Sequence, residues 1–322
     1  MPDTAPLSQL EAAQEVVYGH MKPTPELWWA LLSERTGCDV WVKHENHTPI
    51  GAFKVRGGLN YLEKFAAENP DSPGIISATR GNHGQSLAYA CARKNVPLTI
   101  LVPYGNNPEK NAAMRALGAN LVEHGDDFQE AREQAEVMGA GDGLHMIGPF
   151  HPWLMAGVGS YALEFLLAVP DLDTVYVPVG QGSGICGMVS ARDALGHTTN
   201  IVGVVAENAA AYALSFEQGQ NVSTISADTI ADGLACRVPD DQALAIIMGG
   251  VERIETVSEA AIRRAMKVYF TDTHNIAEGA AAAPLAALLN ETAKMAGKKV
   301  GLVHSGGNVD ADLFKLVLEE EI

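Results

Sequence analysis

Basic residues are scarce in this chain of 322 residues. Lys and Arg together number 22 against 39 Asp and Glu, which gives a formal net charge of −17. Because no basic stretch is present to neutralise phosphates, this balance argues against a nucleic-acid-binding protein. A small anionic ligand is not excluded, since a few backbone N–H groups can hold one phosphate.

Cysteines are few and far apart. The four of them, Cys38, Cys91, Cys186 and Cys236, form no Cys-x-x-Cys pair, so we expect neither disulfides nor a zinc site but buried free thiols in a reducing cytoplasm. The N-terminal residues lack the basic and apolar regions of a signal peptide, and the longest apolar run, 280–289, is too short to span a bilayer. The sequence therefore predicts a cytoplasmic protein without membrane attachment.

Short apolar runs alternate with amphipathic stretches along the chain, which is typical of α/β proteins with a mainly parallel sheet. Strands are expected at residues 40–43, 74–77, 98–102, 120–123, 144–147, 174–179, 201–206 and 300–304. Helices are expected at residues 85–94, 108–117, 128–138 and 258–271, with Pro108 and Ser258 as start signals and Gly118 as a stop signal.

Two turn-like proline clusters, at residues 70–73 and 149–152, bracket a segment about half as long as an ordinary domain. We therefore predict a small domain of residues 75–148 and a large domain of residues 1–74 and 149–322.

A lysine surrounded by small residues is the first candidate for chemistry. Residues 51–58 read Gly-Ala-Phe-Lys-Val-Arg-Gly-Gly. A lysine that forms a Schiff base must be reachable by an aldehyde and must be neutral when it attacks. The small neighbours of Lys54 leave room for this, and Phe53 offers a face to a planar ring. An isolated lysine of this kind is more often a surface residue.

A polar loop between an expected strand and an expected helix is the second candidate. Residues 77–85 read Ser-Ala-Thr-Arg-Gly-Asn-His-Gly-Gln. Hydroxyl, amide and backbone N–H groups meet there at a helix N-terminus, which suits a carboxylate ligand. An ordinary N-capping turn has the same composition.

A glycine-rich loop follows the strand expected at 174–179. Residues 180–187 read Gly-Gln-Gly-Ser-Gly-Ile-Cys-Gly, and such a loop can wrap its backbone around a phosphate. Gly182, Gly184 and Gly187 also spell the Gly-x-Gly-x-x-Gly fingerprint of dinucleotide-binding proteins, with Glu207 twenty residues after the last glycine. On this element alone, an NAD-dependent oxidoreductase is a strong alternative.

The last candidate is Ser305, which follows the final expected strand within the sequence His-Ser-Gly-Gly-Asn at 304–308. A hydroxyl in this place can hydrogen-bond a pyridine nitrogen without protonating it. A turn with a serine cap is the plain alternative.

These four motifs, in this order, resemble the fold type II family of pyridoxal-phosphate (PLP) enzymes, and within it the threonine/serine dehydratases. The resemblance extends over nearly the whole chain and includes Thr24-Pro25, Pro108-Glu109-Lys110, Ala231-Asp232-Gly233 and Glu278-Gly279-Ala280-Ala281. It implies an α/β fold like that of the tryptophan synthase β subunit, with parallel-type sheets in a large and a small domain, and it implies a homodimer.

The resemblance also implies a role for each motif. Lys54 is implied to carry PLP and to act as the base at the substrate's α-carbon. The residues implied to bind the cofactor's ring, phenolic oxygen, phosphate and pyridine nitrogen are Phe53, Lys54, Asn82, Gly180, Gln181, Gly182, Ser183, Gly184 and Ser305. Asn82 is assigned to the phenolic oxygen, the glycine loop to the phosphate and Ser305 to the pyridine nitrogen. Those implied to bind the substrate are Thr79, Arg80, Gly81 and His83.

Arg80 departs from the family pattern, which is Ser-Ser/Ala-Gly-Asn-His where this chain has Thr-Arg-Gly-Asn-His. In racemases of the family, a serine at this position is the acid/base on the second face of the substrate. An arginine stays protonated and cannot take that role, so we expect no efficient racemase activity. Arg80 would instead pair with a substrate carboxylate, stack on an aryl ring, or form an ion pair at the surface.

Two further departures concern the glycine loop and its surroundings. Gln181 and Ser183 stand where the family mostly has glycine, which keeps the backbone donors and adds a hydroxyl. Metal-dependent relatives place an acid, a backbone carbonyl and a second acid at the positions of Glu207, Ala211 and Ala213. Since an alanine side chain cannot ligate, we expect no metal site.

The sequence thus predicts a PLP-dependent ammonia-lyase that converts a β-hydroxy amino acid to a 2-oxo acid and ammonia. Threonine or serine is the expected substrate, with phenylserine and 3-hydroxyaspartate as variants. A PLP β-replacement synthase usually has Lys-Asp-Arg at the cofactor lysine, whereas this chain has Lys54-Val55-Arg56. An NAD-dependent oxidoreductase leaves the lysine motif and the Ser305 loop unexplained.

Overall fold

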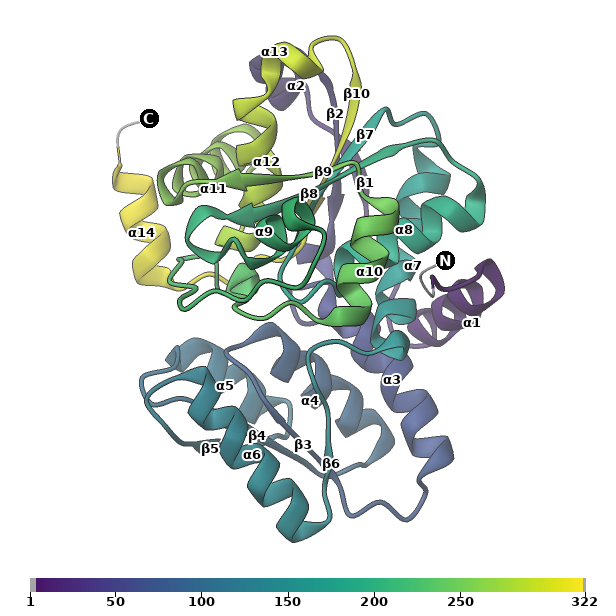
Figure 1. Ribbon diagram of the computed structural model, residues 1–322, viewed down its shortest axis with the longest axis vertical. Helices are drawn as coiled ribbons and strands as arrows, with labels where there is room; N and C mark the ends of the chain where they lie inside the picture. The colour runs from purple at the N-terminus through teal and green to yellow at the C-terminus, as the bar shows by residue number, and fades with distance from the viewer. Residues whose placement is uncertain (1–3, 321–322) are drawn as a thin grey trace.

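The computed structural model describes residues 4–320, and their strands form two separate sheets (Figure 1). The larger sheet has the order β1 (Glu26–Trp28), β2 (Asp39–His44), β10 (Lys299–His304), β7 (Thr174–Pro178), β8 (Asn200–Ala206) and β9 (Arg253–Val257). Strand β1 pairs antiparallel with β2, and the other neighbours pair parallel. The smaller sheet has the parallel order β5 (Asn120–Glu123), β4 (Leu98–Val102), β3 (Ile75–Ala78) and β6 (His145–Met146).

Helices cover both faces of each sheet. On the larger sheet, α7 (Pro152–Ala168), α8 (Ser183–Leu195) and α10 (Asp241–Gly250) pack on one face, and α11 (Glu259–Thr273) and α12 (Gly279–Asn290) pack on the other. On the smaller sheet, α3 (Lys54–Glu68) and α4 (Asn82–Lys94) pack on one face, and α6 (Phe128–Asp142) packs on the other. The remaining helices are α1 (Leu7–Tyr18), α2 (Ala30–Thr36), α5 (Pro108–Ala116), α9 (Ala211–Gln218), α13 (Thr292–Met295) and α14 (Ala311–Glu319).

The core of the larger sheet shows the two-residue period of a strand that is covered on both sides. Val175 and Val177 of β7 face the cluster formed with α7 and α8, whereas Tyr176 between them faces the cluster formed with α12. Helix α3 extends from the larger unit along the smaller one (Figure 1), so the segment that begins at Lys54 belongs to the junction of the two.

The predicted strands all exist, and those at 98–102 and 120–123 match β4 and β5 to the residue. Ser258 caps α11 by accepting a hydrogen bond from the N–H of Ala261, and Gly118 follows α5 with a φ of +95°. Strands β1 and β9 were not expected. All four strands of the smaller sheet lie within the predicted small domain, but the assignment of segments to domains stays a prediction.

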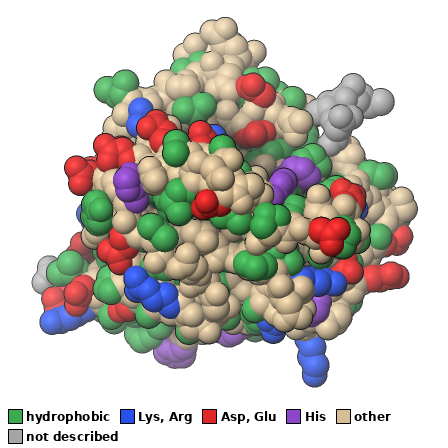
Figure 2. Space-filling view, turned by 90° about the horizontal axis from the view of Figure 1, so that it is seen from below, with side chains coloured by type: hydrophobic (Ala, Val, Ile, Leu, Met, Phe, Trp, Pro, Cys, Tyr) green, Lys and Arg blue, Asp and Glu red, His purple; other side chains and the backbone are tan. Residues whose placement is uncertain are grey.

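The surface near the smaller sheet mixes acidic, basic, apolar and neutral side chains (Figure 2). None of the described helices is both long and apolar enough to cross a membrane.

A close contact between α7 and α8 gives a stability prediction. A Cβ atom added at Gly187 would lie 3.0 Å from the backbone Cα of Gly159. A helix backbone cannot move aside as a flexible side chain does, so Gly187→Ala should lower the free energy of unfolding by about 1–3 kcal/mol in urea titrations. Gly141→Ala in α6 is the control, because its Cβ would meet nothing within 4 Å. An equal urea midpoint for the two variants would contradict this prediction.

Candidate active site

The lysine motif and the Ser305 loop lie side by side because the strands that precede them, β2 and β10, are parallel neighbours. The carboxyl ends of both strands meet at one edge of the sheet, where ligands bind in open α/β sheets. The N–H of Phe53 donates to the carbonyl oxygen of Ser305 at 2.9 Å, and the N–H of Gly307 donates to that of Gly51 at 2.9 Å. Ser305 itself is buried.

Lys54 is the first residue of α3, and its side chain is half-buried. Its Nζ lies 4.9 Å from the centroid of the Phe53 ring, and its carbonyl oxygen accepts a hydrogen bond from the Ser86 hydroxyl at 2.5 Å. Burial lowers the pKa of Lys54 to about 8, although the negative charge of Glu278 acts in the opposite direction. A substantial share of Lys54 is therefore neutral just above neutral pH, as a nucleophilic amine requires.

Asn82 begins α4 and connects the polar loop to the other motifs. Its Nδ2 donates to the carboxylate of Glu278, at 2.8 Å from Oε1 and 3.1 Å from Oε2. Its Oδ1 accepts a hydrogen bond from Nδ2 of Asn308 at 2.8 Å, and the same Nδ2 donates to the carbonyl oxygen of Ile50. Asn82 is thus joined to the segments that hold Lys54 and Ser305.

The glycine loop leads into α8 next to Phe53. Gly182 has a φ of +93°, and within residues 4–320 no side chain caps the first turn of α8. The N–H groups of that turn are therefore free to hold an anion, as a phosphate loop requires. A Cβ at Gly180 would lie 2.0 Å from the carbonyl oxygen of Gly233, and one at Gly184 would lie 3.5 Å from the Phe53 ring. Gln181 accepts a hydrogen bond from the Tyr212 hydroxyl through its carbonyl oxygen, and Ser183 is buried.

The residues implied to bind substrate lie on the loop before α4. Thr79 is buried and accepts a hydrogen bond from the N–H of Gly81 at 3.1 Å. His83 is buried too, and its Nε2 has no hydrogen-bond partner among the described residues. Burial, assisted by the charge of Lys54, lowers the pKa of His83 to about 3, so the imidazole stays neutral.

Arg80 lies further out, with 45% of its side chain exposed and its guanidinium 3.9 Å from the Asp232 carboxylate. The other oxygen of Asp232 accepts a hydrogen bond from Nζ of Lys110 at 2.7 Å, and Lys110 is buried. Although burial favours its neutral form, Asp232 holds the pKa of Lys110 above its usual range. Two cations from the smaller unit thus meet one carboxylate from the larger unit beside the polar loop.

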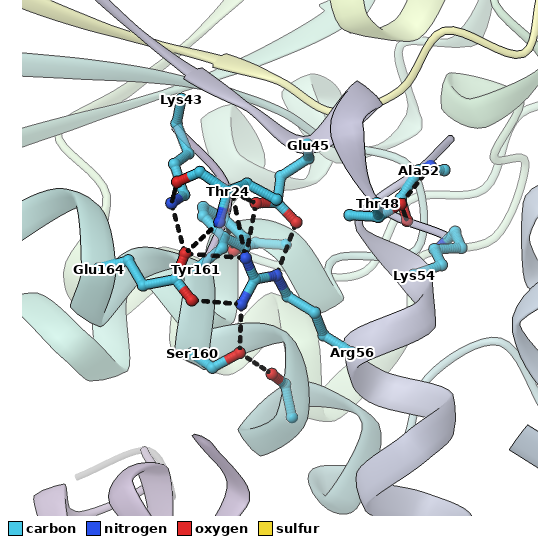
Figure 3. Close-up of polar contacts among 12 residues, drawn as sticks. Thr24, Lys43, Glu45, Thr48, Ala52, Lys54, Arg56, Ser160, Tyr161 and Glu164 are labelled. Carbon is cyan, nitrogen blue, oxygen red and sulfur yellow. Dashed lines mark hydrogen bonds and ion pairs between the residues drawn. The ribbon is translucent and has the colours of Figure 1, made fainter. Parts of the chain in front are cut away.

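A buried network of charges is centred on Arg56, two residues after Lys54 in α3 (Figure 3). Arg56 donates from Nε to Glu45 at 2.7 Å and from Nη1 to Glu164 at 2.7 Å, and Lys43 also pairs with Glu164. Arg56, Glu45 and Lys43 are fully buried. Burial works against the charge of Arg56, but the two carboxylates raise its pKa above the ordinary value. The network therefore joins the first turn of α3, which begins at Lys54, to α7 and the end of β2.

Most of the residues predicted from the sequence come together here, and others join them unpredicted. Phe53, Lys54, Asn82, the glycine loop and Ser305 converge, while Arg80 lies at the exposed margin. No role was predicted for Glu278, Lys110 or Asp232, although each stands in a motif that carries the family resemblance. Their contacts join residues far apart in the chain, and the motifs they stand in were the signal that could have found them.

Comparisons with known proteins place the chain in a family. Residues 17–306 match the family described as pyridoxal-phosphate dependent enzymes, and the chain belongs to this family, whose cofactor is PLP. The chain is 31% identical over 315 residues to an L-threonine ammonia-lyase of Thermotoga maritima, covering 98% of this chain and 78% of that protein. It is 34% identical over 301 residues to an L-threo-3-hydroxyaspartate ammonia-lyase of Saccharomyces cerevisiae, covering 93% and 92%. A solved structure of the processed form of threonine deaminase isoform 2 from Solanum lycopersicum aligns with a TM-score of 0.90 at 29% identity, covering 99% of this chain and 95% of that chain.

These comparisons confirm the predicted family, the fold type II architecture and the cofactor. They decide against the NAD interpretation of the glycine fingerprint. The structure also explains in another way why its last position, residue 187, is a glycine. Gly187 allows α8 to approach Gly159 of α7, and Glu207, the expected ribose ligand, is exposed. The residues also fit PLP: a lysine with a lowered pKa lies among an aromatic ring, an uncapped helix N-terminus and glycines whose Cβ atoms would meet their neighbours.

The charge network predicts a large stability effect at Arg56. In Arg56→Gln, the carboxylates of Glu45 and Glu164 lose the cation between them, which should cost about 3–5 kcal/mol in the free energy of unfolding. Arg132→Gln is the control, since its exposed pair with Glu136 should contribute about 0–1 kcal/mol. Urea titration of both variants tests this, and a loss below about 1 kcal/mol for Arg56→Gln would overturn it.

Proposed function

We propose that this protein is a PLP-dependent ammonia-lyase that removes water and ammonia from a β-hydroxy amino acid. The observation that carries the proposal is the convergence of Lys54, the uncapped α8 N-terminus and the polar loop on the junction of the two sheets. Support also comes from the relatives, which are named threonine and threo-3-hydroxyaspartate ammonia-lyases. Threonine or serine is the default substrate, and 3-hydroxyaspartate and phenylserine are the variants.

The cofactor site is assigned residue by residue. Lys54 would carry PLP, Phe53 would pack on its ring, and Asn82 would donate a hydrogen bond to its phenolic oxygen. The phosphate would be held by Gly180, Gln181, Gly182, Ser183 and Gly184, and the Ser305 hydroxyl would donate to the pyridine nitrogen. When bound, PLP supplies the electron sink that allows a proton to leave the α-carbon. Because a serine hydroxyl does not protonate the ring nitrogen, the site favours β-elimination.

The polar loop binds and orients the substrate. Thr79, Gly81 and the N-terminus of α4 accept the α-carboxylate, and neutral His83 lies beside Lys54 without adding a charge. With PLP and substrate bound, Lys54 would be the base that takes the α-proton on its own face of the substrate. Arg80 cannot serve as an acid/base on the other face, so the protein is proposed to eliminate and not to racemise.

The surroundings of the site complete the proposal. The small domain, residues 75–148, is proposed to close over the substrate on the large domain, residues 1–74 and 149–322. A cytoplasmic location is supported by the cysteines Cys38, Cys91, Cys186 and Cys236, which are free and buried. A homodimer is supported by the edge strand β1 with its exposed Leu27, Trp28 and neighbouring Leu31, since edge strands with apolar side chains favour pairing.

Replacing the lysine tests the function directly. Lys54→Ala should lose the yellow absorbance of lysine-bound PLP and the release of 2-oxo acid and ammonia from threonine and serine, because no other amine is assigned to the cofactor. Lys64→Ala on the same helix is the control and should keep both. A purified wild-type protein that stays colourless after incubation with PLP would contradict the proposal.

Arg80 is proposed to select the substrate. For a substrate with a distal carboxylate, such as 3-hydroxyaspartate, Arg80→Ala should lower kcat/KM by about ten- to a hundred-fold, because a charge-assisted hydrogen bond is lost. For threonine, the change should stay below about threefold. Arg115→Ala, which removes an exposed arginine that pairs with Glu123, is the matched control. If Arg80→Ala leaves threonine, serine, phenylserine and 3-hydroxyaspartate equally unaffected, Arg80 has no part in specificity.

A further inference from the structure

Glu278 is a buried carboxylate that does not serve the helix it precedes. It occupies the N-cap position of α12, where acidic side chains usually accept a hydrogen bond from the first turn, yet within residues 4–320 its side chain caps no N–H of that helix. It accepts hydrogen bonds from Nδ2 of Asn82 with both oxygens, at 2.8 and 3.1 Å. Its own N–H donates to the carbonyl oxygen of Gly306 at 3.1 Å, which holds it against the Ser305 loop.

The hydrogen bonds of Asn82 permit one orientation of its amide. Oδ1 faces the donor Nδ2 of Asn308, and Nδ2 faces the acceptors of Glu278. A flipped amide would place two donors against each other on one side and three acceptor oxygens on the other. The atom that must donate to the phenolic oxygen of PLP is Nδ2, which is the atom that Glu278 holds.

Charged groups from three other elements surround Glu278. They are Lys54 at the start of α3, Lys110 in α5 and Asp232 after the loop that leads from α9. Burial raises the pKa of Glu278 to about 7, with Lys110 and the Asn82 hydrogen bond acting against it, Asp232 adding to it and Lys54 again opposing it. The carboxyl group of Glu278 therefore changes its charge near neutral pH. Its negative charge in turn raises the pKa of Lys54.

We propose that Glu278 is a positioning residue of the cofactor site, which fixes the Asn82 amide with Nδ2 as the donor and controls how readily Lys54 loses its proton. This inference rests on the cofactor placement proposed above. It adds a fourth group to the lysine, the asparagine and the serine: one that touches Asn82 and acts on Lys54 through its charge.

Two variants separate the effect of the Glu278 charge on Lys54 from the effect of its hydrogen bond with Asn82. Glu278→Gln keeps an acceptor oxygen for Asn82 but removes the negative charge. Glu278→Ala removes both, which leaves Nδ2 of Asn82 without its acceptor. The charge effect is therefore the difference between Glu278→Gln and the wild type. The hydrogen-bond effect is the difference between Glu278→Ala and Glu278→Gln.

The charge effect is measured on the rate at which full-length apoprotein captures PLP, followed by the absorbance of lysine-bound PLP between pH 6 and 10. Only neutral Lys54 attacks the aldehyde, so the wild-type rate should rise with a midpoint near pH 8. In Glu278→Gln, loss of the attractive charge should move this midpoint down by about one pH unit. The ionisation of PLP itself is common to all variants and cancels in their comparison.

The hydrogen-bond effect is measured as the dissociation constant of PLP at a single pH. Glu278→Gln should stay within about threefold of the wild type, and Glu278→Ala should bind PLP about tenfold more weakly, since a buried donor is left unsatisfied. Should the Ala variant fail to fold, the pH midpoint of the Gln variant still decides the inference.

Glu109→Gln is the matched control, because it removes an exposed carboxylate next to Lys110 without touching Asn82. A capture midpoint for Glu278→Gln equal to that of Glu109→Gln would overturn the inference. That outcome differs from a failure of the proposed function, in which wild-type apoprotein would not capture PLP through Lys54 at any pH.

Discussion

The guanidinium group of Arg56 lies in the interior of the protein with no access to water, and the surrounding structure is arranged to keep it paired. An unpaired charge in this place would cost several kcal/mol, so Glu45 and Glu164 must stay where they are. Glu45 follows β2, Glu164 belongs to α7, and Arg56 is two residues from Lys54. The first turn of α3, which begins at Lys54, is thereby fixed against the larger sheet.

From this fixed point the site extends through hydrogen bonds of the backbone and of amides. The strand pair β2–β10 brings the Ser305 loop to Phe53, and the amide of Asn308 brings Asn82 to the same edge. Much of the fold was readable from local pattern, because strands covered on both faces are nearly continuous apolar runs. Strand β9, with its half-buried Arg253 and Glu255, has no such run, and β1 is only three residues long.

The residues of the site could be predicted from the sequence where several of them are neighbours in the chain, as in the lysine and glycine motifs. The parts of the site that depend on contacts between distant segments could not be predicted in this way. Glu278 and Asn82 are separated by 196 residues, and nothing in either segment indicates the partner before the sheets are assembled. The same holds for Lys110 and Asp232, whose ion pair crosses between the two units. Arg80, by contrast, was recognised as a departure from the family pattern, but its surface position beside Asp232 required the structure.

The place of β10 has a consequence for how the protein is made. This strand is inserted between β2 and β7, in the interior of the larger sheet, and it is the last strand of the described chain to leave the ribosome. Domains generally fold as units once their parts have been synthesised, so the earlier strands of this sheet must wait for their central member. Until that moment the nascent chain lacks the Ser305 loop, so the segment that leads into Lys54 is without the backbone hydrogen bonds that Phe53 and Gly51 make with this loop.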